Sequence, residues 1–410
     1  MSRGLRSSLR RPKSFRVNLL LNLVIAFLAI DIMMITLAHQ PKLVPPSQVK
    51  ASAPTTQDLV GHYLSSCQDQ KCVMEASKQM TKDYDPARAI AALVLFRSQH
   101  PGGNLGDPHL WAHEVGEETA QKYGVSGETF TKCPDTFNYG CSHGFFESLV
   151  LKNHSLKQTI DDICGKFEQN PKYSSKQKYY CYHGAGHGVL SDVNYDIDKA
   201  LSICDSLNSS FGTEGCWQGA FMEADNAANE GDAPPGAFSD KQHPLAPCDR
   251  VAEKYQNQCY INLPGRLIVV EDNDPVAAAQ DCLAASQPNR KVCFDGLGIV
   301  ISNDTWQMQQ SAYNNGDLVG NSWKICQQFP KDYTDRCIFG VVAGITNVDQ
   351  YKSDRAIEFC KIVDTDLRSW CFQSLGNDLR GIYVTSAVVE KQCRLAPTNY
   401  AGACLRGAGL

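Results

Sequence analysis

Two patterns of apolar and polar residues divide this chain. The first is a nearly continuous apolar run from Val17 to Ala38, in which Asp31 is the only charged residue. At about 1.5 Å per residue, a helix of this length crosses the roughly 30 Å hydrocarbon core of a bilayer, so the run predicts one transmembrane helix. The second pattern begins at Asp58 and continues to the C-terminus: segments with helical spacing of apolar residues alternate with polar loops, and no segment alternates strictly as a strand does. An all-α domain is therefore expected after the membrane helix.

The residues around the apolar run set its orientation. Residues 1–16 contain several Lys and Arg but no Asp or Glu, and such a basic tail stays in the cytoplasm. The main domain is then expected outside the cytoplasm, in the periplasm, on the cell surface or in a lumen. A cleaved signal peptide is the alternative, because Thr36-Leu37-Ala38 fits a cleavage site. The apolar run exceeds the about 7–15 residues usual for a signal peptide, which favours an uncleaved anchor over 17–38.

The composition after the anchor separates a linker from the main domain. Residues 39–57 are rich in Pro, Ser, Thr and Ala and cannot build a core, so we expect a linker there and an extracytoplasmic domain over 58–410. From His39 onward acidic residues outnumber basic ones, and the net charge is about −10. An acidic surface repels phosphate backbones, so a nucleic acid partner is not expected.

The spacing of the 18 cysteines predicts their pairing. An even number of cysteines outside the cytoplasm favours disulfides. Five successive pairs have the same separation of 11 positions: Cys248 with Cys259, Cys282 with Cys293, Cys326 with Cys337, Cys360 with Cys371, and Cys393 with Cys404. Four less regular pairs precede them: Cys67 with Cys72, Cys133 with Cys141, Cys164 with Cys181, and Cys204 with Cys216. We therefore expect local disulfides that use every cysteine and leave no free thiol.

The residues that flank the cysteines repeat as well. Three positions after the second cysteine most units have glycine: Gly144, Gly184, Gly219, Gly296, Gly340 and Gly407. Each unit is expected to be a helical hairpin in which the disulfide joins the end of one helix to the start of the next, adding roughly 3 kcal/mol. In one unit Pro275 suits a first helical turn, Gln287-Pro288-Asn289 should break the chain, and the second helix should begin near Cys293. Two helices in each repeat of about 30–45 residues are typical of an αα-solenoid, the fold we expect.

The chemistry-bearing residues divide this domain into two parts. Residues 58–223 form a half rich in His and Glu, whereas residues 248–410 hold the regular cysteine-paired repeats. The longest interruption between units, Ala224–Pro247, separates them. Long loops in compact domains often serve as lids or binding loops, although a tolerated insertion explains this one equally well.

Histidine and glutamate recur at steps of four in three successive segments of the first half. The residues are His109, His113 and Glu117, then His143 and Glu147, then His183 and His187. Residues four apart share one face of a helix. Two of the histidines, His143 and His183, each lie two positions after the second cysteine of their unit. We therefore expect these two side chains to face each other across adjacent helices.

This set of side chains predicts a metal site. Imidazole and carboxylate groups are ligands of divalent Zn, Fe and Mn, and neighbouring helices can direct such groups at one ion. The expected ligands are His113, Glu117, His143, Glu147, His183 and His187, with the ligating atoms of at least four of them near one centre. Contacts to substrate or to the ligands are expected from His109, Gln218 and Glu223.

A single His/Glu pair would not be enough to predict this site. Such a pair also occurs on ordinary solvated or buried helix faces, and only the recurrence in three successive segments favours a shared site. The segment HEVGE lacks the second histidine of the HExxH zinc motif. The sequence also lacks a P-loop, a dinucleotide fingerprint, CxxCH and GxSxG.

Two functions follow from these observations. The first is a membrane-anchored, extracytoplasmic metal-dependent enzyme, either a hydrolase or an oxidoreductase. The alternative is a helical-repeat scaffold that binds protein or peptide partners on a concave face, with a structural metal or none. An open coordination position beside a pocket favours the enzyme, whereas a closed four-ligand site favours the scaffold.

Overall fold

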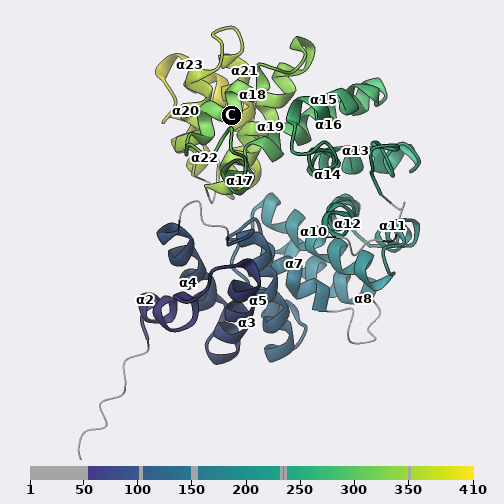
Figure 1. Cartoon of the computed structure of the whole chain (residues 1–410), viewed down its shortest axis with the longest axis vertical. Coiled ribbons are helices and arrows are strands. Elements are labelled where there is room, and N and C mark those ends of the chain that lie inside the picture. The colour runs from purple at the N-terminus through teal and green to yellow at the C-terminus, as the bar shows by residue number, and fades with distance from the viewer. Residues whose placement is uncertain (1–53, 101–104, 149–155, 231–233, 235–237, 350–351) are drawn as a thin grey trace, which may run out of the picture. The chain divides into compact units, whose positions relative to one another are not determined.

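The computed structural model describes residues 54–100, 105–148, 156–230, 234, 238–349 and 352–410. As predicted, all regular structure in these ranges is helical, with no strand (Figure 1). The helices up to Glu230 are α2 (Thr56–Leu59), η1 (Val60–Leu64), α3 (Gln70–Asp83), α4 (Pro86–Gln99), α5 (Pro108–Tyr123), α6 (Gly127–Phe130), α7 (Gly140–Glu147), α8 (Leu156–Ile160), η3 (Asp161–Gly165), α9 (Lys166–Gln169), α10 (Ser175–Asp192), α11 (Ile197–Asp205) and α12 (Ser210–Glu230).

Further helices follow Glu230 and continue to the C-terminal end of the described residues. They are α13 (Glu253–Asn262), α14 (Pro264–Val270), α15 (Pro275–Ala284), α16 (Gln287–Ile301), α17 (Asp304–Gln309), α18 (Leu318–Cys326), η4 (Lys331–Tyr333), α19 (Thr334–Val348), α20 (Asp354–Ile362), α21 (Arg368–Ile382), α22 (Ser386–Cys393) and α23 (Thr398–Gly407).

Six of the nine disulfides join one helix to a later one, whereas Cys67, Cys133 and Cys248 lie in the loop before the helix that holds their partner. The nine predicted pairs are all bonded, and no described cysteine is free. The bonds are Cys67 to Cys72, Cys133 to Cys141, Cys164 to Cys181, Cys204 to Cys216, Cys248 to Cys259, Cys282 to Cys293, Cys326 to Cys337, Cys360 to Cys371, and Cys393 to Cys404. In the unit formed by α15 and α16, Cys282 lies in the last turn of the first helix and Cys293 in the second. The predicted helical repeats are therefore confirmed, with disulfides across most of the helix pairs.

Aspartate and proline begin several of these helices. Asp107 accepts a hydrogen bond from the backbone N–H of His109 at the start of α5, and Pro108 occupies the first turn. The expected break at Gln287-Pro288-Asn289 is wrong, because α16 already begins at Gln287. A proline in the first turn of a helix loses no hydrogen bond, so the tripeptide that looked like a breaker starts the helix instead.

The second helices of successive units pack against each other in chain order. Contacts link α5 to α7, α7 to α10, α10 to α12, α12 to α13, and then α13 through α16, α19 and α21 to α23. Glycine allows their close approach: a Cβ atom at Gly144 would lie 1.9 Å from the carbonyl oxygen of His113. The same relation holds between Gly219 and His183, where the distance would be 1.8 Å. The repeated glycines therefore fix how these helices meet.

Buried apolar side chains form two clusters in the described part of the chain. One includes residues from Leu59 to Phe238 and the other residues from Leu201 to Ala408, so both draw on α11 and α12. On α7 the fully buried Phe145 and Phe146 belong to the first cluster. Their burial sets the rotation of α7 and directs the other face of this short helix toward α5 and α10.

Two expected boundaries need correction, and the expected anchor lies outside the described residues. Helix α2 begins at Thr56 with a capping box between Thr55 and Asp58, so the linker ends before residue 57. Helix α12 continues through Glu230, so the interruption predicted from Ala224 begins as helix. The predicted anchor over 17–38 lies outside the described residues, and no helix within them is long and apolar enough to cross a membrane.

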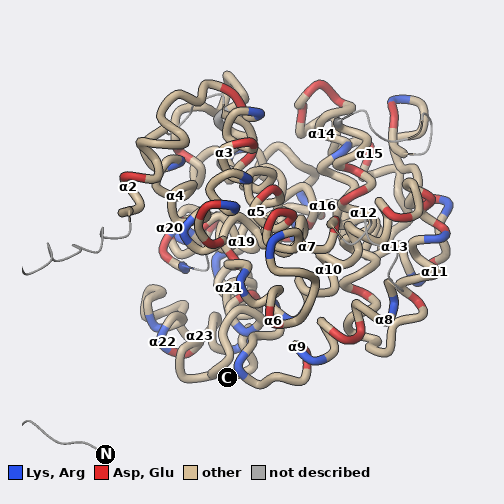
Figure 2. Tube along the Cα trace, turned by 90° about the horizontal axis from the view of Figure 1, so that it is seen from below, with Lys and Arg blue, Asp and Glu red and all other residues tan. Residues whose placement is uncertain are grey.

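Charged residues are distributed over many helices of the described part. In the view of Figure 2, acidic and basic residues are both scattered over the described part of the chain. The expected absence of a nucleic acid partner stays a prediction.

Candidate metal centre

Four second helices, α5, α7, α10 and α12, pack against one another in chain order (Figure 1). Each carries two polar side chains of the candidate centre, which lie four residues apart and on one helix face in α5, α7 and α10, and five residues apart in α12. The residues are His109 and His113 on α5, His143 and Glu147 on α7, His183 and His187 on α10, and Gln218 and Glu223 on α12.

The two histidines of α5 present their Nε2 atoms to each other. The Nδ1 atom of His109 lies 2.8 Å from the carbonyl oxygen of Phe137. That oxygen only accepts, so Nδ1 carries the proton and Nε2 keeps a lone pair. On His113, Nδ1 lies 3.1 Å from a carboxylate oxygen of Glu147, and Nε2 lies 3.0 Å from Nε2 of His109.

The two histidines of α10 repeat this arrangement. Nδ1 of His183 lies 3.1 Å from Oε1 of Gln218, and Nδ1 of His187 lies 3.0 Å from Oε2 of Glu223. Both rings therefore hold their proton on Nδ1, bonded to a side-chain oxygen. Their Nε2 atoms face each other at 3.3 Å, and both side chains are fully buried. Neither nitrogen can donate to the other in this tautomer.

His143 lies between the two pairs. Its Nδ1 atom is 3.2 Å from Nε2 of His109, and its ring stacks on that of His187 with a centroid distance of 4.3 Å. The Nε2 atom is buried and has no hydrogen-bond partner among the described residues. A buried nitrogen without a partner costs free energy, which a bound cation would recover.

Burial keeps most of these imidazoles uncharged. It lowers the pKa of His143 and of His183 well below the ordinary histidine value, and the neighbouring His187 ring acts in the same direction. It also lowers the pKa of His187 to about 3, and burial together with the charge of His113 lowers the pKa of His109 to about 4. These rings are neutral at pH 7, which is the form that binds a metal ion.

His113 and Glu147 behave differently because they form an ion pair. Burial acts to lower the pKa of His113, but the Glu147 carboxylate outweighs it and raises this pKa above the ordinary value. Burial likewise acts to raise the pKa of Glu147, but the charge of His113 lowers it to about 2. Glu147 is therefore ionised at neutral pH.

The atoms that could hold an ion form three overlapping groups. In each group the ligating atoms lie within 4.8 Å of one another: His109 with His113 and His143, His143 with His183 and His187, and Glu147 with His187 and Glu223. Two nitrogens that bind one ion at about 2.0–2.1 Å lie roughly 2.9–3.4 Å apart for ligand angles between about 90° and 109°. The Nε2 separations of 3.0 and 3.3 Å on α5 and α10 agree with this range.

Five of the six expected ligands come together in these groups, linked through His143 and His187. Glu117 does not belong to any of them. Its carboxylate pairs with Lys78 of α3 at 3.0 Å and accepts a hydrogen bond from Gln121. Glu117 lies one turn beyond His113 on α5. At this position a residue of α3 rather than of α7 provides the partner, so Glu117 does not reach the centre.

The three residues expected to contact substrate or ligands take two different positions. Gln218 lies at hydrogen-bond distance from the His183 ring, whereas His109 and Glu223 belong to the groups that could bind an ion. Sequence reasoning missed the Phe137 carbonyl, because a backbone oxygen in a loop leaves no sequence signal. It also missed Asp225, although this residue lies two turns after Gln218 on the same face of α12.

Two cavities border the histidines. One has a volume of about 430 Å³ and includes His113, Glu147 and Glu223 in its wall. The other has a volume of about 360 Å³, and His109 and His183 line it. The two cavities therefore border different residues of the centre.

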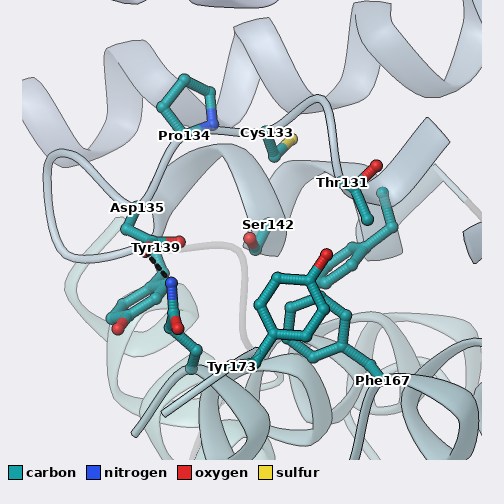
Figure 3. A pocket seen from close by; sticks show the side chains of 10 residues that line it. Thr131, Cys133, Pro134, Asp135, Tyr139, Ser142, Phe167 and Tyr173 are labelled. Carbon is teal, nitrogen blue, oxygen red and sulfur yellow. Dashed lines mark hydrogen bonds between the residues drawn. The ribbon is translucent and has the colours of Figure 1, made fainter. Parts of the chain in front are cut away.

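A third cavity, of about 220 Å³, lies beside the loop before α7 (Figure 3). The hydroxyl of Ser142 faces it, whereas the next residue, His143, belongs to the histidine centre. Asp135 and Gln177 are joined across it by a hydrogen bond of 2.6 Å, and Phe167 and Tyr173 stack at its edge. Its polar groups are partly paired with each other, and it contains none of the candidate ligands.

The chain matches no protein-family model, no curated protein and no solved structure.

Proposed function

We propose that the protein is a membrane-anchored, extracytoplasmic metal-dependent enzyme with its centre on α5, α7, α10 and α12. The observation that carries the proposal is the pair His183 and His187. Both rings are buried, both Nδ1 atoms donate to side-chain oxygens, and the two Nε2 lone pairs face each other at 3.3 Å. Facing lone pairs repel unless a cation lies between them, and the separation suits a divalent ion.

We assign the principal ion to His143, His183 and His187. The buried Nε2 of His143 has no other partner among the described residues, and these three residues form one of the groups described above. His109 and His113 offer a second position. At this second position Glu147 favours a protonated His113, whose Nε2–H could donate to Nε2 of His109 without any metal. The α10 pair therefore gives the stronger support for a metal.

The side chains around the principal position have separate tasks in this proposal. Gln218 and Glu223 fix the tautomer and the orientation of the two α10 rings, as oxygen acceptors do behind metal-bound histidines. Glu147 is ionised and lines the 430 Å³ cavity, so it places a negative charge there beside His113. A divalent ion supplies Lewis-acid chemistry for hydrolysis, or redox chemistry toward oxygen or peroxide if it is Fe or Mn.

A binding scaffold with a structural metal is the second candidate. Its support is the packing of successive second helices in chain order from α5 to α23, which fits the αα-solenoid that we propose for residues 58–410. A protein or peptide partner would bind on the concave face of such a solenoid. Two features favour the enzyme: the disulfides and the two cores already hold the helices together, and cavities border the histidines.

Metal analysis of the full-length protein tests this function. We expect at least one equivalent of Zn, Fe or Mn per chain at pH 7.5, measured by elemental analysis after removal of weakly bound ions. Redox-inert Zn would indicate a hydrolase, and Fe or Mn an oxidoreductase. A protein that carries no metal as purified and takes up none of the three ions on incubation would contradict the proposal.

The location outside the cytoplasm rests on the disulfides and on the sequence of the N-terminus. Many disulfides indicate an oxidising compartment, and we propose that residues 17–38 anchor the protein in the membrane with the N-terminus in the cytoplasm. We expect the protein to be released from membranes by detergent but neither by high salt nor by alkaline carbonate. A soluble mature form that begins near His39 would show instead that the apolar segment is a cleaved signal.

A further inference from the structure

The 360 Å³ cavity beside the histidines has a wall rich in amide side chains. His109, His143 and His183 form one part of it, and residues of α12, α13, α14, α16, α17 and α19 form most of the rest. Among the described lining residues are six asparagines and one glutamine, but no lysine or arginine. The aromatic rings of Tyr180 and Trp306 also face the cavity. An anionic ligand would find no positively charged side chain in this described wall.

Several of these amides use only half of their hydrogen-bonding capacity within the protein. Asn262 donates through Nδ2 to the carbonyl oxygens of Gln218 and Gln258, which leaves its Oδ1 as an acceptor. Asn229 accepts through Oδ1 from Arg266, which leaves its Nδ2 as a donor. The bonds already made fix the orientation of each amide, so the remaining groups are preorganised for a ligand.

Asp225 adds a group with no partner at all among the described residues. Its side chain belongs to a residue only 8% exposed, lines the cavity, and makes no hydrogen bond that the described residues could provide. The carboxyl group is therefore available to hydrogen-bond with the hydroxyl groups of a ligand in the cavity.

We propose that this cavity binds a neutral polyhydroxylated ligand, a carbohydrate. Each hydroxyl group both donates and accepts, as the Oδ1 atom of Asn262 and the Nδ2 atom of Asn229 require, and Trp306 in the wall provides an aromatic ring against which a sugar can pack. An apolar ligand would leave these buried polar groups unpaired. The inference that the sugar is the enzyme's substrate rests on the proposed metal centre. The inference that the cavity binds a sugar does not depend on that centre.

The test measures binding of short neutral glycans to the full-length protein in a detergent without a sugar headgroup. Calorimetric titration uses maltotriose, mannotriose and chitotriose, with trigalacturonate as the anionic comparison. We expect at least one neutral trisaccharide to bind with a Kd below about 1 mM, and trigalacturonate to bind at least about tenfold more weakly. Failure of all three neutral glycans, or preferred binding of the anion, would overturn the inference.

Two variants place the binding in this cavity. Asp225→Leu and Asn226→Ala remove side chains that line the cavity and make no hydrogen bond with described residues, so folding should be preserved. We expect each to weaken glycan binding about tenfold or more, the effect of one lost hydrogen bond to a ligand. Asn314→Ala, at an exposed asparagine outside the cavity, should bind as the wild type does. Unchanged binding by both cavity variants would overturn the inference.

The same titration separates the two proposals. Glycan binding by a protein that holds no metal would leave the carbohydrate site standing and remove the metal centre. A metal-loaded protein that binds none of the glycans would do the reverse.

Discussion

Replacing both α10 histidines with alanine is expected to remove about one equivalent of metal per chain while the fold remains. His183→Ala with His187→Ala deletes two of the three nitrogens assigned to the principal ion. A single remaining imidazole, that of His143, cannot hold a divalent ion against water and competing chelators. Elemental analysis gives the metal content, and far-ultraviolet circular dichroism with non-reducing peptide mapping checks the helices and disulfides. The fold should persist because the cores and nine disulfides do not include these rings.

The matched control is the other pair at the same spacing. His109→Ala with His113→Ala removes two buried or half-buried imidazoles from the adjacent α5 and should leave the principal ion bound. If the α10 variant retains the full wild-type metal content, the assignment to His183 and His187 fails. Loss of helical structure in the alanine variant would call for His183→Gln with His187→Gln, which preserves more side-chain volume and should release the metal equally.

The sequence predicted both the helical hairpins and their disulfides because both follow from the spacing of the paired cysteines. A separation of 11 positions places two cysteines on either side of a short loop between helices, and the same interval recurs from Cys282 to Cys293 and from Cys360 to Cys371. The helix boundaries were predicted less well. The tripeptide at Gln287 contains residues that end one helix and equally well begin another, and only the structure decides which.

The sequence predicted which residues of the candidate site occupy equivalent positions on successive helices, but not which side chains contact each other. Spacing relative to the cysteines placed His143 and His183 at equivalent positions, and their ring centroids lie 5.0 Å apart. Which carboxylates approach the rings depends on the height at which each helix meets its neighbour. Because of this offset along the helix axes, Glu117 pairs with Lys78, and Glu223 contacts His187. Helix periodicity alone does not determine the offset. The anchor and the solenoid stay proposals.

Replacing Gly219 with alanine is expected to damage both the fold and the centre. A Cβ atom at this position would lie 1.8 Å from the carbonyl oxygen of His183 and 2.8 Å from its carbonyl carbon. The obstacle is backbone, so α12 must move away from α10. Such overpacking costs about 1–3 kcal/mol, occasionally more. The displacement also separates Gln218 from His183 and Glu223 from His187, so we expect metal affinity to fall at least about tenfold.

A matched glycine separates this steric effect from the change in helix propensity. Gly402 lies in the middle of α23 and is exposed, and a methyl group added there would meet only the Arg406 guanidinium, at an ordinary contact distance of 3.7 Å. Gly402→Ala should raise the free energy of unfolding by about 0.4–1 kcal/mol, because alanine favours a helix and restricts the unfolded chain. Urea unfolding and metal titration of both variants give the comparison. Wild-type stability and metal affinity in Gly219→Ala would show that the close contact of α10 and α12 does not hold the centre together.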